Sequence, residues 1–311
     1  MILTIVFLIL GLILVVYGSD ILVDGASAVA RKLGISEFVI GLTIVGFGTS
    51  CPELVVSLNG AFSGSGDISI GNVVGSNIFN TLLILGLTAV IAPIGISSEN
   101  KRRDIPVLLT VTFFFILLCL KGSIGLVDGI IFLILFAAYM YLSFKGDKAP
   151  QESGEESKPT PLWLSILMIA GGLAGLVLGG KLFVNNAVAI ASAAGVSEKF
   201  IAVTLLAGGT SLPELATCIV AAVKKKGALA LGNILGSNVF NILLILGCSA
   251  LVTPLSTKGM SYVDLGVLLL STLLILFSAF TGKEKNSVDR FDGALMLLVE
   301  AAYMVYLFVT L

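Results

Sequence analysis

Apolar runs of similar length alternate along this chain with short interruptions of Gly, Pro and charged residues. A helix needs roughly 20 consecutive, mainly apolar residues to cross a lipid bilayer. The runs predict ten such helices, at about residues 2–28, 36–62, 68–92, 104–121, 125–145, 161–190, 197–223, 228–253, 261–281 and 289–310. We therefore expect an all-α membrane protein with ten transmembrane helices.

One stretch of this pattern occurs twice, with its polar residues in the same places. The first copy contains GFGTSCPEL and GNVVGSNIFN, which begin at Gly46 and Gly71. The second contains GGTSLPEL and GNILGSNVFN, which begin at Gly208 and Gly232. One constant offset, the distance from Glu53 to Glu214, aligns the two copies without a gap. A repeat of this kind constrains the fold more strongly than any single motif.

A polar stretch at residues 146–160, rich in Pro, Ser, Glu and Lys, is typical of a solvated linker. It separates a first five-helix repeat, 1–145, from a second, 161–311. Five is an odd number, so the second repeat enters the membrane from the opposite side and is inverted. Equivalent residues then meet near the midplane, as in many secondary transporters. The linker is too short for a folded Ca²⁺-sensing domain.

Basic residues concentrate at alternate connections between the predicted helices. One side has clusters that begin at Arg31, Lys101, Lys145, Lys224 and Lys283, whereas the other has only Lys121, Lys199 and Lys258. By the positive-inside rule, both termini lie outside the cell membrane and the linker is cytoplasmic.

Composition agrees with a multi-pass membrane protein, because 57% of the residues are hydrophobic and only 12% are charged. The chain has no His, which excludes His metal sites and Ser/His catalysis. The four Cys lie in apolar runs without a CxxC motif, as small buried residues do. We expect the protein to lie in the lipid bilayer. We expect no enzymatic activity, no cofactor, no nucleic-acid partner and no obligatory protein partner.

Two carboxylates define the candidate chemistry. Glu53 falls near the middle of the predicted second helix, and Glu214 occupies the equivalent depth in the inverted copy. A carboxylate at mid-membrane costs at least ~3 kcal/mol, so it needs a proton, a cation or a polar partner. Two such carboxylates that face one axis suit a divalent cation.

A proline precedes each carboxylate, at Pro52 and Pro213, and predicts a break in the second and the seventh helix. Proline inside a helix provides no N–H for the carbonyl four residues earlier and pushes that carbonyl aside. The oxygens expected to be freed are those of Gly48 or Thr49 and of Gly209 or Thr210. Together with the Thr, Ser and Glu side chains they predict an all-oxygen cage, which suits Ca²⁺ and Na⁺ rather than Zn²⁺.

The GNxxGSNxFN segments add further oxygens. Asn72, Ser76 and Asn80 are spaced at i, i+4 and i+8, on one face of a helix, and Asn233, Ser237 and Asn241 repeat the spacing. We interpret Asn72, Asn77, Asn233 and Asn238 as structural. The deeper residues are candidate ligands: Ser76, Asn80, Ser237 and Asn241.

TSxPE followed by GNxxGSNxFN, present twice, resembles the α-repeats of the cation/calcium exchanger superfamily, and most closely its prokaryotic Na⁺/Ca²⁺ exchangers. The resemblance covers essentially the whole chain. It implies ion ligation by Glu53, Glu214, Thr49, Ser50, Thr210, Ser211, Ser76, Ser237, Asn80 and Asn241, with carbonyls near Gly46 and Ala207. It also implies that helices 1 and 6 slide across a fixed core of helices 2, 3, 7 and 8 to alternate access.

Some relatives, including K⁺-dependent members, carry an acidic residue at the position of Asn80 or Asn241, where this chain has Asn. The expected function is exchange of Na⁺ for Ca²⁺, with both ions transported as substrates. H⁺/Ca²⁺ exchange is the nearest alternative, since a buried carboxylate can carry a proton. K⁺-dependent exchange and a cation channel are further alternatives. An intramembrane protease would need a nucleophile next to a base, which the sequence lacks.

Some other charged residues within the predicted helices also need an interpretation. Asp20 and Asp24 lie near the inner end of the first helix, whereas Lys181, at the repeat position of Asp20, lies near the outer end of the sixth. Inversion prevents Lys181 from pairing with either aspartate, and we interpret all three as interfacial or gate-mouth residues. Glu300 lies in the middle of the tenth helix, where the first copy has Phe136, and it predicts a polar partner or a proton site.

Overall fold

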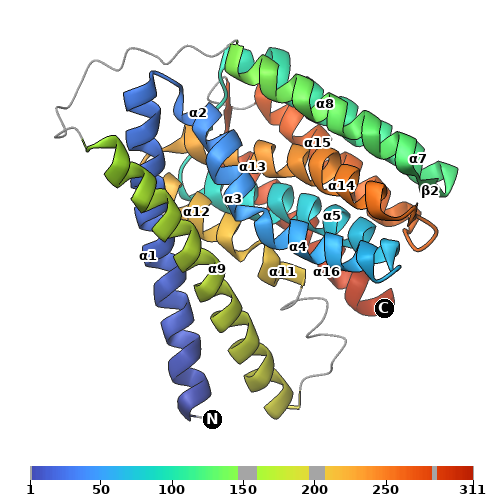
Figure 1. Cartoon of the computed structure of the whole chain (residues 1–311), viewed down its shortest axis with the longest axis horizontal. Coiled ribbons are helices and arrows are strands. Elements are labelled where there is room, and N and C mark those ends of the chain that lie inside the picture. Colours follow the sequence, from blue (N-terminus) through green and yellow to red (C-terminus); the bar gives the residue numbers. More distant parts are fainter. Residues whose placement is uncertain (1, 146–159, 196–206, 282–285, 311) are drawn as a thin grey trace.

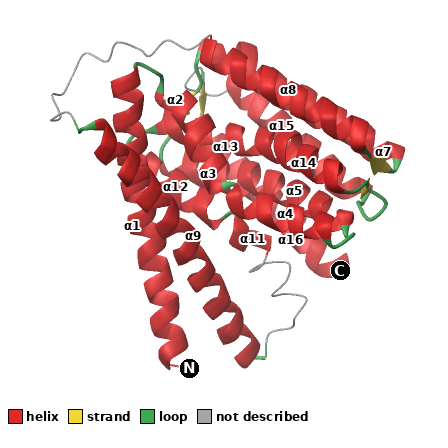
Figure 2. Cartoon of the chain, viewed as in Figure 1, coloured by secondary structure: helices red, strands yellow, loops and turns green. Residues whose placement is uncertain are grey.

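The computed structural model describes residues 2–145, 160–195, 207–281 and 286–310, and helices make up nearly all of them (Figure 2). Several helices contain a π-helical turn, labelled η. The first half contains α1 (Ile2–Leu33), α2 (Glu37–Ile40), η1 (Gly41–Val45), α3 (Gly46–Thr49), α4 (Cys51–Phe62), α5 (Gly66–Phe79), η2 (Asn80–Leu85), α6 (Gly86–Ile91), β1 (Ile94–Gly95), η3 (Asn100–Asp104), α7 (Ile105–Lys121), β2 (Ser123–Ile124) and α8 (Leu126–Lys145).

The second half repeats much of this order. It contains α9 (Leu162–Ala193), α11 (Ala207–Thr210), α12 (Leu212–Val223), α13 (Gly227–Phe240), η5 (Asn241–Ile245), α14 (Leu246–Val252), β3 (Leu255–Ser256), α15 (Tyr262–Thr281), β4 (Ser287–Val288) and α16 (Arg290–Thr310). The bounds of α12 and α13 follow those of α4 and α5 at the same constant offset that aligns the two sequence copies.

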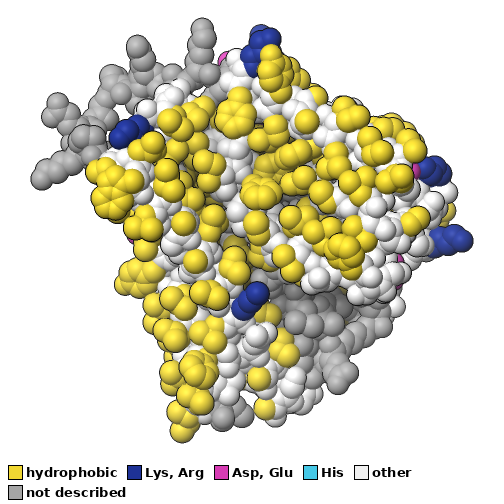
Figure 3. Space-filling view, viewed as in Figure 1, with side chains coloured by type: hydrophobic (Ala, Val, Ile, Leu, Met, Phe, Trp, Pro, Cys, Tyr) yellow, Lys and Arg dark blue, Asp and Glu magenta, His cyan; other side chains and the backbone are white. Residues whose placement is uncertain are grey.

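Eight described helices are long and apolar enough to cross a membrane, and a ninth span results if the bent pair 37–49 and 51–62 is counted as one. Of the predicted seventh helix, only α11 and α12 are described, because residues 196–206 lie outside the described part of the chain. The number ten therefore stays a prediction. Large apolar side chains cover the face seen in Figure 3. Over the described molecule as a whole, Trp163, Phe280 and Phe291 are among the exposed large hydrophobic residues. The all-helical membrane architecture is thus confirmed.

Four two-residue strands in the described part of the chain connect loops of the two halves, and they were not predicted from the sequence. Strand β1 pairs with β4, and β2 pairs with β3, both in antiparallel orientation. Each pair joins a loop of the first half to a loop of the second. Both pairs therefore tie together the halves that the linker separates in sequence.

Helices α1 and α9 lie side by side and extend away from the other helices (Figure 1). Small residues make this contact close. On α1 they are Gly11, Gly18 and Gly25, at a regular heptad spacing, and on α9 they are Gly179, Gly172 and Ser165. A Cβ atom on Gly18 would lie 2.9 Å from the carbonyl oxygen of Gly172. The two backbones are therefore in direct contact, as in other small-residue interfaces in membranes.

The rest of the molecule packs around α13, every residue of which is buried from Leu229 to Phe240. Its motif glycines lie against the broken helix of the first half. A Cβ atom on Gly232 would be 2.1 Å from the carbonyl oxygen of Phe38, and one on Gly236 would be 2.4 Å from that of Leu42. The glycines of GNILGSN thus let two helix backbones touch in the centre of the molecule.

Glu300 is buried in α16, with 3% of its surface exposed, and among the described residues neither of its carboxylate oxygens has a hydrogen-bond partner. Helix α16 packs against α6 and η2. In the first half, the equivalent Phe136 contacts Phe240 edge-to-face, with ring centroids 5.2 Å apart. The repeat therefore replaces an aromatic packing residue by a carboxylate.

We expect Glu300→Phe to stabilise the protein. A buried polar group without a partner costs about 1–3 kcal/mol, and the substitution removes it in favour of the residue that the other repeat uses. Thermal unfolding in detergent should show a higher midpoint for Glu300→Phe, and no change for Glu99→Gln, which removes an exposed carboxylate. A lower midpoint for Glu300→Phe together with a normal one for Glu300→Gln would mean that the site cannot hold a ring. A lower midpoint for both variants would mean that the carboxylate is satisfied and stabilising.

Candidate cation site

The candidate site begins at two breaks in the helices. Helix α3 ends at Thr49 and α4 begins at Cys51, and the helical segments on either side of Ser50 are bent by 47°. Ser50 has φ −83° and ψ 4°, and Ser211 has almost the same angles, −87° and 8°, between α11 and α12. Both TSxPE motifs therefore place a serine where one helix stops and the next begins.

Pro52 and Pro213 each lie at the second residue of the new helix. In the first turn of a helix, proline's missing N–H has no intrahelical partner to lose, and its fixed φ suits the helix. Each proline therefore starts a helix rather than interrupting one. Glu53 and Glu214 follow directly, in the first turn of α4 and of α12.

The two halves exchange hydrogen bonds at the glutamates. Ser211 Oγ donates to Glu53 Oε1 at 3.0 Å, and Ser50 Oγ donates to Glu214 Oε1, also at 3.0 Å. Glu53 is 0% exposed and Glu214 is 1% exposed. Each carboxylate is thus held by the serine of the other repeat, and the two TSxPE motifs form one site.

Neutral oxygens lie next to these serines. Ser50 Oγ is 2.9 Å from Ser237 Oγ, which is 3.5 Å from the carbonyl oxygen of Gly46. Thr49 Oγ1 is 3.4 Å from the same carbonyl and 3.1 Å from Asn233 Oδ1. The carbonyl of Gly46 therefore lies in the same cluster as the hydroxyls on the Glu214 side of the site.

Five buried oxygens from the predicted site have no hydrogen-bond partner in the described part of the chain. They are Glu53 Oε2, Glu214 Oε2, Thr210 Oγ1, Asn80 Oδ1 and Asn241 Oδ1. Segment η2, which begins at Asn80, packs against α12, and η5, which begins at Asn241, packs against α4. Buried polar atoms are normally satisfied, and a bound cation would satisfy these oxygens.

The remaining asparagines join helices to one another. Asn72 Nδ2 donates to Ser57 Oγ at 2.9 Å and to the main-chain oxygen of Glu53 at 3.1 Å. Asn233 Nδ2 lies 3.3 Å from Cys218 Sγ, across the same pair of helices in the second half. These contacts fit the interpretation of both asparagines as structural, and they fix α4 on α5 and α12 on α13.

A second set of amides links the two halves. Asn77 Oδ1 accepts from Asn241 Nδ2 at 2.9 Å, and Asn238 Nδ2 donates to Thr81 Oγ1 at 2.8 Å. Neither Thr81 nor Ser57 is among the candidate residues predicted from the sequence. The spacing does carry a signal for Ser57, because it lies one helical turn after Glu53 and so on the same helix face. Ser76 is buried at 3% exposure.

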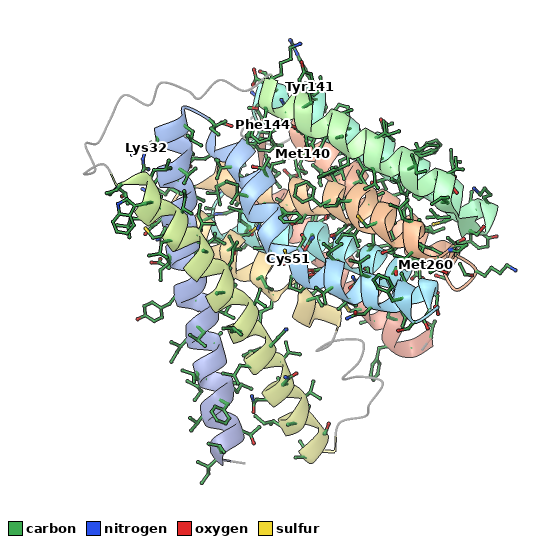
Figure 4. All side chains as sticks on the ribbon, in the orientation of Figure 1. Lys32, Cys51, Met140, Tyr141, Phe144 and Met260 are labelled. Atoms are coloured by element: carbon green, nitrogen blue, oxygen red, sulfur yellow. The ribbon has the colours of Figure 1, made fainter. Side chains whose placement is uncertain are left out.

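A cavity of about 570 Å³ lies beside the site, between α4, α9 and α12. Its lining includes Cys51, Pro52, Thr210, Asn72 and Lys181. Figure 4 shows Cys51 at the centre of the molecule, where α4 begins. Because Thr210 and Cys51 flank the serines that hold the carboxylates, the cavity ends at the candidate site.

The donor set decides which ions fit. No group of three or more His, Cys, Asp or Glu able to hold a metal ion occurs among the residues that the structure describes. The site offers two carboxylates and several neutral oxygens, from hydroxyls, amides and a carbonyl. Hard cations such as Ca²⁺ and Na⁺ prefer oxygen ligands of this kind, whereas softer metals prefer nitrogen and sulfur.

Comparison with known proteins assigns the chain to a family. The family model described as sodium/calcium exchanger protein matches residues 3–145 and again 164–310. Solved structures of the sodium-calcium exchanger NCX_Mj are similar, and the one from crystals soaked with Na⁺ and Ca²⁺ has a TM-score of 0.86 and 35% identity, with 98% of each chain covered. The fold and both repeats therefore agree with an exchanger over nearly the whole chain.

Curated relatives also match over nearly their whole length. The putative antiporter CaxA of Alkalimonas amylolytica is 37% identical, covering 97% of this chain and 98% of the relative. The sodium/calcium exchanger MaX1 of Methanosarcina acetivorans is 34% identical, covering 97% of each. The chain therefore belongs to the sodium/calcium exchanger family, as a prokaryotic membrane transporter built from two repeats.

Proposed function

We propose that this protein exchanges Na⁺ for Ca²⁺ across the cell membrane by alternating access, with both ions binding at Glu53 and Glu214. The observation that carries the proposal is the pair of buried carboxylates, each held by the other repeat's serine and each with one unpartnered oxygen among the described residues. Thr49, Ser50, Thr210, Ser211, Ser76, Asn80, Ser237 and Asn241 complete the proposed ligand set, with the carbonyls of Gly46 and Ala207.

The charge of the site supports exchange. Two carboxylates balance one Ca²⁺ or two Na⁺, and both ions need the same oxygens, so they compete. Asn80 and Asn241 add no charge. A third Na⁺ would leave the loaded site net positive, and exchange would then be electrogenic. An imposed membrane potential should in that case change the flux at fixed ion gradients.

The proposed orientation puts both termini outside and residues 146–160 in the cytoplasm, with the second repeat inverted relative to the first. In that orientation the cavity, which follows α9 from Leu176 to Asn185, opens outward. On the other side of the site, Lys224 Nζ lies 2.8 Å from Asp20 Oδ1 and 2.7 Å from Asp24 Oδ1. Lys224 thus links α1 to the end of α12 on the proposed cytoplasmic side.

The positive charge of Lys224 supports this link between α1 and α12. Burial alone would lower the pKa of the Lys224 ammonium, but its hydrogen bonds to Asp20 and Asp24 outweigh that effect and raise the pKa above its usual value. The ammonium therefore stays charged at neutral pH. If α1 and α9 slide together during transport, the Lys224 pairs must break when the cytoplasmic side opens.

We expect Lys224→Ala to shift the protein toward the inward-open state. Partly exposed ion pairs contribute about 0.2–1 kcal/mol, which corresponds to a population change of roughly 1.4-fold to 5-fold. Spin labels on α1 and α12 should report the shift by their distance distribution. Lys225→Asn is the matched control, because Lys225 is exposed and Asn tolerates its positive φ of 58°. An unchanged distribution in Lys224→Ala would mean that the pairs do not hold α1.

Radioactive Ca²⁺ uptake into proteoliposomes tests the proposed function. Vesicles loaded with Na⁺ are diluted into Na⁺-free buffer, and K⁺-loaded vesicles with clamped pH serve as control. Uptake that depends on the Na⁺ gradient is the expected result. Uptake driven by a pH gradient without Na⁺ would instead support H⁺/Ca²⁺ exchange, and single-channel currents would indicate a channel.

A further inference from the structure

Lys181 lines the cavity that ends at the candidate site. It is exposed and lies on α9, across the cavity from Cys51 and Pro52 of α4. No Asp or Glu lies within 4.0 Å of its ammonium in the described ranges, and the cavity lining contains no acidic residue among them. The described access path therefore carries one fixed positive charge.

The repeat shows that this charge is particular to one side of the molecule. Lys181 occupies the position that Asp20 has in the first copy, at the same offset as the motifs, and Asp20 pairs with Lys224. The residue of the first copy equivalent to Lys224 is Ser63, which has no charge. One side of the protein thus has a paired cluster of opposite charges, whereas the open side has a cation without its counterpart among the described residues.

A fixed positive charge acts on every cation in a confined cavity, and its energy is proportional to the charge of the ion. The electrostatic energy of Ca²⁺ at any point is therefore twice that of Na⁺. Rates and local concentrations depend exponentially on this energy. If Lys181 lowers the local concentration of Na⁺ by a factor f, it lowers that of Ca²⁺ by the square of f.

We propose that Lys181 is a specificity-determining residue of the access path, where its charge disfavours divalent relative to monovalent cations. This inference rests on the proposed Na⁺/Ca²⁺ exchange. At the open face Lys181 slows the binding of Ca²⁺ more than that of Na⁺. The ratio of Na⁺ to Ca²⁺ that reaches the outward-open site is therefore higher than their ratio in the external solution.

The electrostatic effect of Lys181 in the cavity can be measured without a transport assay, because the thiol of Cys51 lines the same cavity and can be labelled. Cys119 and Cys218 are buried, so a Cys248→Ser background leaves Cys51 as the accessible thiol. The purified protein is treated with a cationic and with an anionic methanethiosulfonate reagent of similar size, and the ratio of the two rates is determined. A change in this ratio on substitution reports the change in electrostatic potential at Cys51.

Lys181→Gln should raise the cationic rate about 3-fold and lower the anionic rate about 3-fold, and Lys181→Glu should change both further in the same directions. High salt should reduce the difference, because it screens exposed charges. Lys258→Gln is the matched control: Lys258 is an exposed lysine expected at the same face of the membrane, and it does not line the cavity. A rate ratio unchanged by Lys181→Gln would overturn the proposal.

Transport provides the second, independent arm. In proteoliposomes, Lys181→Gln should lower the external KM for Ca²⁺ by about the square of its effect on the KM for Na⁺, roughly 10-fold against 3-fold. Equal changes in the two KM values would contradict an electrostatic effect of Lys181. They would indicate that the substitution alters the shape of the cavity. If the wild type catalysed no exchange while the labelling ratio changed as expected, the proposed function would fail and the cavity field would stand. If Cys51 proved unreactive, the two KM values would decide alone.

Discussion

Glu53→Gln and Glu214→Gln are each expected to lower Na⁺-driven Ca²⁺ uptake by about 100-fold or more, while the protein stays folded. Each substitution removes one of the two negative charges that would balance Ca²⁺ in the proposed site. The uncompensated charge costs at least ~3 kcal/mol at mid-membrane, which corresponds to about two orders of magnitude in binding. The measurement is initial-rate uptake of radioactive Ca²⁺ into proteoliposomes with matched protein content.

The control for this pair is Glu37→Gln, which removes a carboxylate from the same broken helix but outside the site. Glu37 pairs with Lys226 at 2.7 Å and is partly exposed. Its substitution should keep uptake within about 2-fold, since exposed ion pairs contribute little. Size-exclusion profiles establish that all three variants are folded. Normal exchange by either Glu53→Gln or Glu214→Gln would show that the site is elsewhere.

Gly232→Ala is expected to destabilise the protein strongly, although it adds a single methyl group. The new Cβ would lie 2.1 Å from the carbonyl oxygen of Phe38 and 2.8 Å from the amide nitrogen of Leu42. Both are backbone atoms in the centre of the molecule, so no flexible side chain can move away. Overpacking of this kind costs typically about 1–3 kcal/mol, and the unfolding midpoint of a chain of this length should fall by about 2–5 °C.

Gly266→Ala is the matched control for the same measurement. Gly266 lies inside α15, and a Cβ atom there would meet nothing within 4 Å. The substitution should leave the midpoint unchanged or raise it slightly, since Ala favours helix over Gly by about 1 kcal/mol. If both variants unfolded at the same temperature, the backbone contact between α13 and the broken helix would not be tight.

Much of the helical architecture could be predicted from the sequence, because apolar runs bounded by Gly, Pro and charge are unambiguous in a membrane protein. The helices predicted at 125–145, 228–253 and 289–310 are found at 126–145, 227–252 and 290–310. The short strands could not be predicted, since two residues carry no periodic signal and their partners are distant in sequence. Helix α1 also extends further than predicted, to Leu33, because Arg31 and Lys32 continue the helix.

The candidate residues of the site could be predicted because two buried carboxylates in a repeated motif stand out in an apolar chain. How the two copies face each other could not. The sequence relates Ser50 to Ser211 and Glu53 to Glu214, but the hydrogen bonds run across the repeats, from Ser50 to Glu214 and from Ser211 to Glu53. Only the three-dimensional arrangement contains that information.

The ion pairs of Lys224 could not be predicted from the sequence either. The charge pattern placed Lys224 on the same side of the membrane as the inner end of the first helix, where Asp20 and Asp24 were expected. The three residues could therefore have been considered together. Their ion pairs join positions in opposite halves of the chain, and no local pattern indicates such a contact.

A single site shared by Na⁺ and Ca²⁺ is tested most directly by equilibrium binding of radioactive Ca²⁺ to the purified protein at increasing Na⁺ concentration. Ionic strength is kept constant with choline, and Glu214→Gln provides the background. If both ions bind at the carboxylates of Glu53 and Glu214, as proposed, Na⁺ should raise the apparent Kd for Ca²⁺ without lowering the number of sites. A Kd that stays constant as Na⁺ rises would contradict a shared site.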